Sequence, residues 1–384
     1  MQKRVKGLGF GLTMANKRKV GFVTHEYYFW HDTGTYAGSY KPGKYIQAGK
    51  HWESPESKRR FKSLVDVSDL KNEVTHIEPR MATIEELERI HNPKHIKNMK
   101  ELSDNGGGLM GDEESTFGPF GYEIGCLSAG GAIAAADAVY KKEVDVAYAL
   151  IRPPGHHAVK DHGMGYCMFN NIGVAIEHLR KTTNLTKFAV IDWDVHHGNG
   201  TQAVFYADPN VLAISLHQDE LYPRHEGKIT ETGEGAGKGF NINIPIPAGS
   251  GDGAYRYAFE NVVKPAIDRF KPEFIFIASG FDASYYDQLS RMALHAYTFK
   301  WMAEETLKLA DKHANGRVVA THEGGYSEVY VPFCGVAVLE AFLDKSSGVP
   351  DYLAEASEAS TRKDQQLHTH QKEMIDECKK THKL

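Results

Sequence analysis

The sequence is poor in the features that mark secreted or membrane-spanning proteins. Its 384 residues include only four cysteines, Cys126, Cys167, Cys334 and Cys378, and no two of them share a short spacing. Neither a disulfide framework nor a cysteine-based zinc site is indicated, so a reducing, cytoplasmic location is expected. No apolar run approaches the roughly 18 residues that a membrane-spanning helix requires, which predicts no membrane partner.

A large excess of one charge is also absent. The formal net charge is −5 and the isoelectric point is near 6.5, which argues against a general nucleic-acid surface. A local acidic mouth that attracts a cationic substrate remains compatible with this balance. Composition does not decide the assembly state, and a homo-oligomer stays open.

Three stretches of different composition divide the chain. Residues 1–18 are basic but lack a sustained apolar core, which predicts a disordered leader rather than a signal peptide. Residues 19–345 alternate apolar and amphipathic segments without an internal repeat or linker, which predicts one folded domain. Residues 346–384 are polar and charged, and we interpret them as a C-terminal extension that forms either a peripheral helix or a loose tail.

The middle stretch predicts an α/β domain with a central, mainly parallel sheet covered by helices on both faces, because strand and helix signals alternate. Strands are predicted at 19–24, 146–152, 188–194, 211–217, 274–280 and 318–324, with a short extended segment at 241–247. Helices are predicted at 56–65, 128–140, 170–181, 254–270, 293–313 and 335–343.

Local signals mark helix starts and one long loop. Ser54-Pro55 is expected to cap the helix at 56–65, and Thr83 with Glu86 forms a capping box. The Gly-rich, acidic segment 104–121 is expected to be a loop. Its acidic run is equally compatible with a solvated surface and with the rim of a substrate site.

The rest of the chain is organised around FAVIDWDVHHGNGTQ, residues 188–202. An apolar run of this kind predicts a buried strand of a parallel sheet, whose carboxyl end is where ligands bind. If the strand persists, Asp192, Asp194 and His196 project from one face. Buried carboxylates are costly unless a cation compensates them, so we favour a divalent metal over a surface turn.

Three further predicted strands run into residues that can carry chemistry. One leads to His156 and His157, another to Asp282 and the third to Tyr326. Each alone is more often a structural residue, but in a parallel sheet all of them finish at the edge that carries Asp194. Together they predict a metal held by two carboxylates and one imidazole, with positions left open for water and substrate, as in catalytic zinc sites.

This set of residues predicts metal-assisted hydrolysis of an amide. A metal lowers the pKa of bound water, a histidine transfers protons, and a tyrosine hydroxyl stabilises an oxyanion. No nucleophile elbow or phosphate-binding glycine loop competes with this interpretation.

Five motifs together resemble the zinc-dependent histone deacetylase family. They occur in family order within residues 19–345, which predicts a deacetylase-like catalytic domain with the arginase/deacetylase fold. Asn199, within WDVHHGNGTQ, makes the chain similar to the class II enzymes and to bacterial histone deacetylase-like amidohydrolases. The motifs are RPPGHHA (152–158), GYCMFNN (165–171), DWDVHHGNGTQ (192–202), SGFDAS (279–284) and EGGYS (323–327).

The resemblance implies a role for each matching residue. His157 would be the general base and acid, hydrogen-bonded to Asn199. His156 would be an electrostatic partner supported by Asp192, and Tyr326 would polarise the scissile carbonyl. The implied zinc ligands are Asp194, His196 and Asp282.

The resemblance also implies potassium beside the zinc. One site would use Asp192 with main-chain oxygens of Asp194 and His196, plus Ser215 and Leu216. A second would use main-chain carbonyls at Phe205, Asp208, Val211 and Phe240.

The implied substrate-binding residues are Gly165, Tyr166, Tyr222 and Asp112. Asp112 matches a rim aspartate that holds the substrate backbone. Tyr166 and Tyr222 stand where the family usually has two phenylalanines, and their hydroxyls could hydrogen-bond a more polar substrate.

The expected activity is removal of acetyl or other acyl groups from acylated lysine in a peptide or protein, or from a similar acetylated amine. An acetylpolyamine deacetylase is the alternative, favoured if extra carboxylates lie at the mouth. A non-catalytic acyl-lysine binder is a third hypothesis, but it would be expected to lack Tyr326 or one of the paired histidines, and the chain keeps them.

Overall fold

Short apolar runs form the centre of the molecule because each can be buried on both faces as a strand. The computed structural model describes residues 17–384, in which eight strands form one sheet with parallel pairing throughout. Their order across the sheet is β10-β9-β8-β11-β12-β7-β1-β4. The strands are β1 (Val20–Val23), β4 (Val74–Ile77), β7 (Val146–Ala149), β8 (Phe188–Asp192), β9 (Val211–Gln218), β10 (Asn241–Ile246), β11 (Phe274–Ser279) and β12 (Val318–His322).

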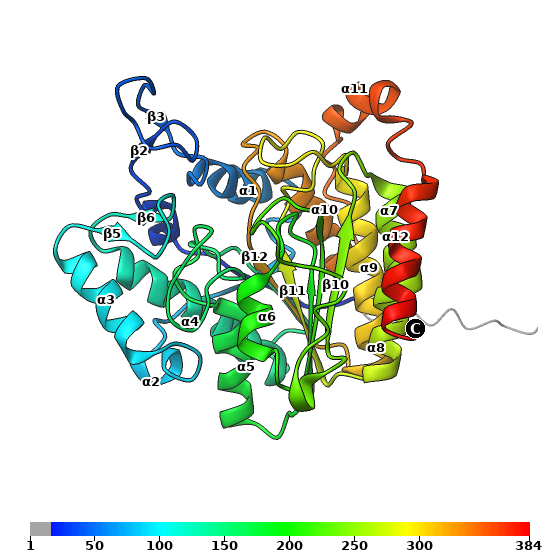
Figure 1. The fold of residues 1–384 in the computed structure, drawn as a ribbon, viewed down its shortest axis with the longest axis horizontal. Coiled ribbons are helices and arrows are strands. Elements are labelled where there is room, and N and C mark those ends of the chain that lie inside the picture. The colour runs from blue at the N-terminus through cyan, green and yellow to red at the C-terminus, as the bar shows by residue number, and fades with distance from the viewer. Residues whose placement is uncertain (1–16) are drawn as a thin grey trace, which may run out of the picture.

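Helices cover both faces of this sheet (Figure 1). Alternating side chains of each strand supply the two cores: in β8, Ala189 and Ile191 join one apolar cluster, whereas Phe188 and Val190 join the other. The helices are α1 (Glu56–Val67), α2 (Ile84–Leu87), α3 (Pro93–Asp104), α4 (Gly121–Tyr140), α5 (Asn171–Thr182), α6 (Asn199–Phe205), α7 (Asp252–Ala258), α8 (Lys264–Phe270), α9 (Ala296–His313), α10 (Val331–Leu343), α11 (Tyr352–Thr361) and α12 (Thr369–Thr381).

The predicted fold class is confirmed: the chain forms a single α/β domain on a parallel sheet. The predicted capping box is present, since Thr83 and Glu86 each accept a hydrogen bond from the backbone N–H of the other. The extended segment at 241–247 is a full edge strand, β10. The opposite edge strand, β4, was not predicted, because Val74–Ile77 has too few apolar residues to stand out.

Three local predictions were wrong. Strand β8 ends at Asp192, so Asp194 and His196 lie in the loop after it and do not continue the alternation of the strand. Ser54 does not cap α1, whose N-cap is Pro55 without a side-chain hydrogen bond. Helix α4 begins at Gly121, seven residues before the predicted start at 128.

The structure describes almost none of the predicted N-terminal leader but all of the C-terminal extension. The predicted leader, 1–18, lies outside the described residues except for its last two. Residues 346–384 form helices α11 and α12, and α12 packs against β10 (Figure 1). Within residues 17–384, no helix has both the length and the apolar composition that crossing a membrane requires.

Two small hairpins lie among the loops outside the sheet. The β2–β3 pair joins Thr35–Tyr36 to Gly49–Lys50, and the β5–β6 pair joins Gly108–Leu109 to Thr116–Phe117. The β5–β6 hairpin lies within the stretch 104–121 that the sequence predicted as a loop.

Candidate active site

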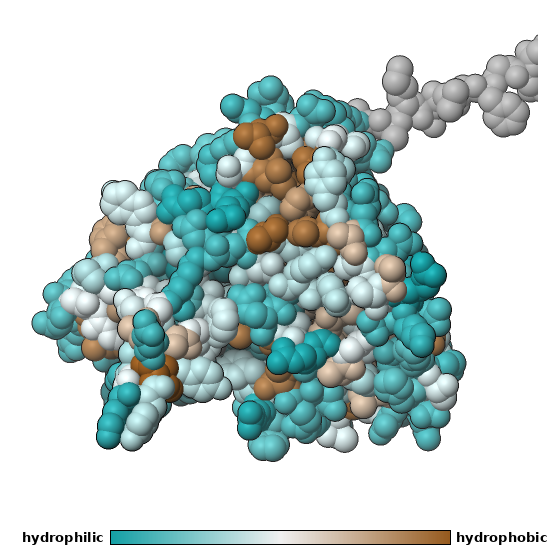
Figure 2. Space-filling model, turned by 90° about the horizontal axis from the view of Figure 1, so that it is seen from above, coloured by the Kyte–Doolittle hydropathy of each residue, from teal (hydrophilic) through white to brown (hydrophobic). Residues whose placement is uncertain are grey.

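Four neighbouring strands bring the predicted residues to one edge of the sheet. The order β8-β11-β12-β7 places the four strand ends side by side, and all four strands run in the same direction. The loops after them carry Asp194, Asp282, Tyr326 and the pair His156–His157. Seen from above, this face of the molecule is mostly hydrophilic, with hydrophobic residues in a few limited patches (Figure 2).

Asp194, His196 and Asp282 converge into one buried group. One ligand atom from each lies within 4.8 Å of the others. Nδ1 of His196 is 3.0 Å from Oδ1 of Asp194 and 3.1 Å from Oδ2 of Asp282. Ligands about 2.0–2.1 Å from one zinc ion in a tetrahedral site lie roughly 3.3 Å apart, so the spacing suits a single cation.

Hydrogen bonds orient the two carboxylates from behind. Asp282 accepts through Oδ1 from the backbone N–H of Val195, at 2.8 Å, and Asp194 accepts through Oδ2 from that of Gly324, at 2.7 Å. Oδ2 of Asp282 is buried, and no described group donates a hydrogen bond to it. A buried oxygen without a donor is costly, which makes it a suitable ligand for a metal ion.

The electrostatics of the three residues also favour a cation. Burial and the neighbouring Asp194 raise the pKa of Asp282 to about 7. Two adjacent buried carboxylates cannot both ionise cheaply without a positive charge between them. The site therefore has the donor types and the charge deficit that a divalent metal would satisfy.

Glycines permit the close approach of the strand ends to this group. A Cβ atom at Gly324 would lie 2.1 Å from Oδ2 of Asp282, and one at Gly280 would lie 2.1 Å from Oδ2 of Asp194. Any side chain at these positions would push the carboxylates apart.

The two histidines at the end of β7 have different partners. Nδ1 of His156 is 3.0 Å from Oδ2 of Asp192, and Nδ1 of His157 is 2.7 Å from Oδ1 of Asn199. Because each partner atom is an acceptor, each Nδ1 carries the proton, and Nε2 of His157 is left free to accept one.

Their charge states differ as well. Burial alone lowers the pKa of His156, but Asp194 and Asp192 outweigh it and raise this pKa to about 10. Burial, together with His156 and His196, lowers the pKa of His157 well below its ordinary value. The pair therefore combines a cationic imidazole with a neutral one.

Tyr326 lies opposite the histidines, on a turn fixed at both ends. Oδ2 of Asp287 accepts from the backbone N–H groups of Tyr326 and Ser327, at 2.7 and 3.0 Å. Gln288 donates to the Tyr326 carbonyl at 3.0 Å. Burial raises the pKa of the Tyr326 phenol well above its usual value, so its hydroxyl stays protonated and can donate.

Behind this turn lies a buried ion-pair cluster, which we call the Glu53 cluster: Glu53, Lys58 and Arg152. Glu53 accepts from Arg152 at 2.9 Å and lies 3.1 Å from Nζ of Lys58. Burial opposes its ionisation, yet the two cations hold the Glu53 pKa far below its usual range. Nζ of Lys58 also lies 3.4 Å from the Gly325 carbonyl and 5.3 Å from the centroid of the Tyr326 ring. The cluster therefore places the Lys58 cation beside the Tyr326 ring.

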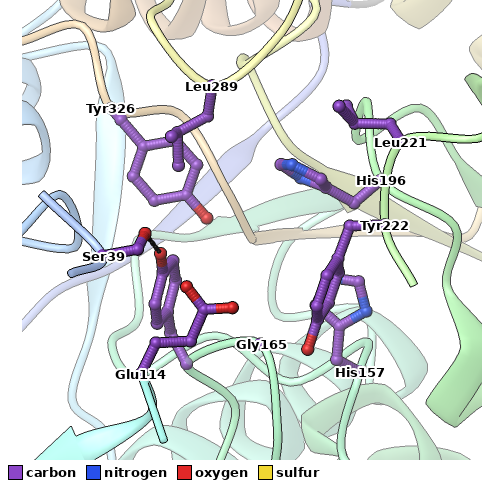
Figure 3. Close-up of a pocket in the computed structure, with 10 residues that line it drawn as sticks. Ser39, Glu114, His157, Gly165, His196, Leu221, Tyr222, Leu289 and Tyr326 are labelled. Carbon is purple, nitrogen blue, oxygen red and sulfur yellow. Dashed lines mark hydrogen bonds between the residues drawn. The ribbon is translucent and has the colours of Figure 1, made fainter. Parts of the chain in front are cut away.

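A cavity of about 160 Å³ opens between the histidines and Tyr326 (Figure 3). Tyr166 and Tyr222, which the sequence predicts as channel walls, both line it, as does Gly165. A Cβ at Gly165 would lie 2.3 Å from Cδ2 of His157, so a glycine is needed where the wall meets the histidine. The complete lining is Ser39, Glu114, His157, Gly165, Tyr166, His196, Leu221, Tyr222, Leu289 and Tyr326.

Asp112 does not line this cavity. Its Oδ1 accepts from the backbone N–H groups of Glu114 and Ser115, at 3.2 and 2.6 Å. Its Oδ2 accepts from the Gly165 N–H at 2.8 Å and from the Tyr222 hydroxyl at 3.3 Å. Oδ1 thus holds the turn of its own loop together, and Oδ2 ties that loop to the cavity wall.

The residues predicted for potassium fall in two places. Asp192 and Ser215 pair across β8 and β9, close to Asp194, whose N–H donates to Asp192, and Leu216 follows in the same strand. The second set lies away from the cavity, because Val211 begins β9 at its amino end; the others are Phe205, Asp208 and Phe240. Carbonyls of Phe205 and Phe240 each accept a backbone N–H, at 2.9 Å.

A second set of donors, His156, Cys167 and Glu323, also lies close together. Glu323 already has hydrogen-bond partners, since it accepts from the N–H groups of Gly155 and His156 at 2.7 and 3.0 Å. Burial raises the pKa of Cys167, so that it stays a thiol. We therefore assign this set a structural role.

Sequence reasoning missed the Glu53 cluster and the lining residues Leu221 and Leu289, whereas Glu114 belongs to the acidic run that was equally compatible with a substrate rim. The sequence marks only Arg152 and Glu323 as unusual, because each is a charged residue in a motif that directly follows an apolar strand. The others lie in loops or on a helix that looks solvated, where nothing local distinguishes them.

The fold and the site define the class of the protein: a parallel α/β fold with a candidate metal site at the carboxyl ends of its strands, where such sheets bind ligands. The histone deacetylase domain matches residues 51–342. A histone deacetylase-like amidohydrolase of Pseudomonas aeruginosa is 45% identical over 339 residues, covering 88% of this chain and 89% of that protein. A probable deacetylase of Archaeoglobus fulgidus is 35% identical, covering 76% and 83%.

The comparison with solved structures agrees with the sequence matches. The crystal structure of the HDA15 HD domain superposes with a TM-score of 0.78 at 26% identity, covering 95% of this chain and 98% of that one. The chain belongs to the histone deacetylase family, and its relatives support a deacetylase or amidohydrolase activity.

Proposed function

We propose that this protein is a zinc-dependent amide hydrolase that removes acetyl or other acyl groups from acylated lysine side chains or similar amines. The observation that carries the proposal is the convergence of Asp194, His196 and Asp282 beside a cavity that is also lined by His157 and Tyr326. The proposal is supported because carboxylate, imidazole and phenol groups, which could bind a metal, transfer a proton and donate a hydrogen bond, lie close together.

Asp194, His196 and Asp282 would hold the zinc. Two carboxylates and one imidazole neutralise a divalent ion and leave coordination positions open. When bound, the metal supplies a lowered pKa for water and polarisation of the scissile carbonyl.

His157 would transfer the proton. The Asn199 acceptor keeps the proton of the imidazole on Nδ1, so Nε2 can take a proton from water and return it to the leaving amine. His156 stays cationic beside Asp192 and stabilises negative charge that develops next to it. The two neighbouring imidazoles would thus have separate roles.

Tyr326 would donate a hydrogen bond to the oxygen of the attacked carbonyl. Its hydroxyl stays protonated, and the fixed backbone on either side positions the ring before substrate binds. A positioned donor of this kind stabilises an oxyanion more than the neutral carbonyl that precedes it.

Two further assignments belong to the proposal. Residues 19–345 would form the catalytic domain. Potassium beside the zinc, at Asp192 and Ser215, is supported by their pairing next to the ligands. The second potassium set, at the far end of β9, has only the family resemblance in its support.

The test is a Tyr326→Phe variant assayed together with its zinc content. We expect the variant to retain zinc, because all three ligands remain, and to lose about 100- to 1,000-fold in kcat on an acetyl-lysine peptide, as expected when an oxyanion donor is removed. Near-normal turnover would remove Tyr326 from the mechanism. A wild-type protein that binds zinc but hydrolyses none of a panel of acetylated amines would refute the hydrolase proposal.

A further inference from the structure

Two acidic residues of the same loop, Asp112 and Glu114, have different environments. Both oxygens of Asp112 are taken by four donors within the protein, so none remains for substrate. Glu114, two residues later, lines the cavity itself. The turn that Asp112 holds together directs the Glu114 side chain inward, and its carboxylate points into the cavity in Figure 3.

The backbone of Glu114 is held on both sides. Its N–H donates to Asp112, and its carbonyl lies 3.0 Å from Nε2 of His51, which contacts it from the opposite side. The side chain is therefore presented by a fixed main chain. Its neighbour Glu113 is exposed and does not line the cavity.

The Glu114 carboxylate has no cation to pair with in the described part of the chain. It is half-buried, it takes part in none of the ion pairs found between described residues, and neither Lys nor Arg lines the cavity. Nearby polar groups are hydroxyls, with Oγ of Ser39 2.6 Å from the Tyr166 hydroxyl (Figure 3). The entrance of the cavity therefore has more hydrogen-bond acceptors than donors, and it carries the negative charge of Glu114.

The same small cavity also contains His157, His196 and Tyr326, so a bound amide would lie close to Glu114. The methylene stem of an acyl-lysine would cover the carboxylate without pairing with it, which carries a desolvation cost. A substrate with an ammonium group at that depth would instead form a charge-assisted hydrogen bond.

We propose that Glu114 is a specificity-determining residue that selects acylated amines carrying an ammonium group a few methylenes from the scissile amide, as in N-acylated diamines and polyamines. This inference rests on the proposed amide hydrolase function and identifies its substrate class. Ser39 and the tyrosine hydroxyls would bind the remaining N–H donors of the ammonium group.

The test compares two amides of equal length with zinc-loaded protein. One is N-acetyl-1,4-diaminobutane, and the other is N-pentylacetamide, in which a methyl group replaces the ammonium. We expect wild type to prefer the charged amide and Glu114→Gln to lower the charged-to-neutral ratio of kcat/KM about tenfold or more, as expected for a lost hydrogen bond to a charge. The loss should fall mainly on KM, because the contact is already made in the bound substrate.

Glu113→Gln is the matched control, since it removes the same charge from an exposed position one residue away. An equal fall in the ratio for both variants would show only general attraction by negative charge and would overturn the assignment. An unchanged ratio in Glu114→Gln would overturn it as well.

A separate binding measurement distinguishes failure of this inference from failure of the proposed function. Calorimetry on zinc-loaded Tyr326→Phe protein measures the affinity of both amides without turnover. If wild type hydrolyses neither amide nor an acetyl-lysine peptide, the hydrolase proposal fails, and the affinity ratio with and without Glu114→Gln still decides the specificity. Equal affinities for the charged and neutral amides would refute it.

Discussion

The floor and the entrance of the cavity are built in different ways. The floor consists of residues at the ends of four adjacent strands, where Asp194, Asp282 and His157 are buried and held by backbone N–H groups or a side-chain amide. The entrance consists of loops, and Ser39, Glu114 and Tyr222 come from segments far apart in the chain. In the proposed mechanism the sheet fixes the groups for chemistry, whereas the loops decide which molecule reaches them.

This difference predicts how substitutions will behave. A change in the floor should lower kcat for every substrate, because the reacting amide is common to all of them. A change in the entrance should alter KM and the ranking of substrates.

The largest effect is expected from the histidine pair in the floor. His157→Ala should lower kcat about 100- to 10,000-fold on any amide, because it removes the neutral imidazole that takes up the proton. His156→Ala should cost less, since it removes a neighbouring charge and not the proton acceptor. Rate measurements on both variants, each checked for zinc content, test this order.

Equal rates for the two variants would contradict the separate roles. A substrate-dependent loss in His157→Ala would contradict the distinction between floor and entrance, since the imidazole is expected to act on the amide alone.

A smaller effect on kcat is expected from Lys58, which lies behind the floor. Lys58→Met removes the cation beside the Tyr326 ring and the contact with the Gly325 carbonyl, while Arg152 continues to neutralise Glu53. We expect kcat to fall about tenfold with little change in KM, because a misplaced donor loses part of its transition-state contact. Steady-state kinetics on two unrelated acetylated amines measure this split.

Lys62→Met is the control, because Lys62 is on the same helix but pairs with Asp66 at the surface. Lys58→Arg should recover part of the rate by restoring a cation. If Lys58→Met lowers kcat by the same factor in a Tyr326→Phe background, the lysine does not act through the tyrosine.

The floor could be predicted from the sequence because its residues follow apolar runs within short motifs. Parallel strands place such residues on one edge regardless of their separation along the chain, so His156, Asp194 and Asp282 could be grouped without a structure. No such rule groups the residues of the entrance, because they come from separate loops. The sequence shows Asp112, Glu113 and Glu114 as three similar acids, and only the hydrogen bonds reveal that Asp112 is consumed by the fold.

The Glu53 cluster could not be predicted for a related reason. Lys58 is one charge in a helix rich in lysine and arginine, and a charged helix position is usually solvated. Its burial follows from tertiary packing against Glu53 and Arg152, which lies about a hundred positions further along the chain. Pairing between such distant residues leaves no periodic pattern in the sequence.

The smallest effect is expected from Asp112→Asn at the entrance. The substitution replaces one acceptor oxygen with an NH₂ group. This group would face a backbone N–H of Gly165, Glu114 or Ser115, so at least one hydrogen bond is lost. One lost hydrogen bond costs about 1 kcal/mol, which corresponds to roughly a fivefold rise in KM. Because the turn that Asp112 holds presents Glu114, the rise should be larger for N-acetyl-1,4-diaminobutane than for N-pentylacetamide, and this difference should disappear in a Glu114→Gln background. A selective loss of the charged amide that persists in the Glu114→Gln background would instead make Asp112 a direct substrate contact, and the division of labour between the two acids would have to be reversed.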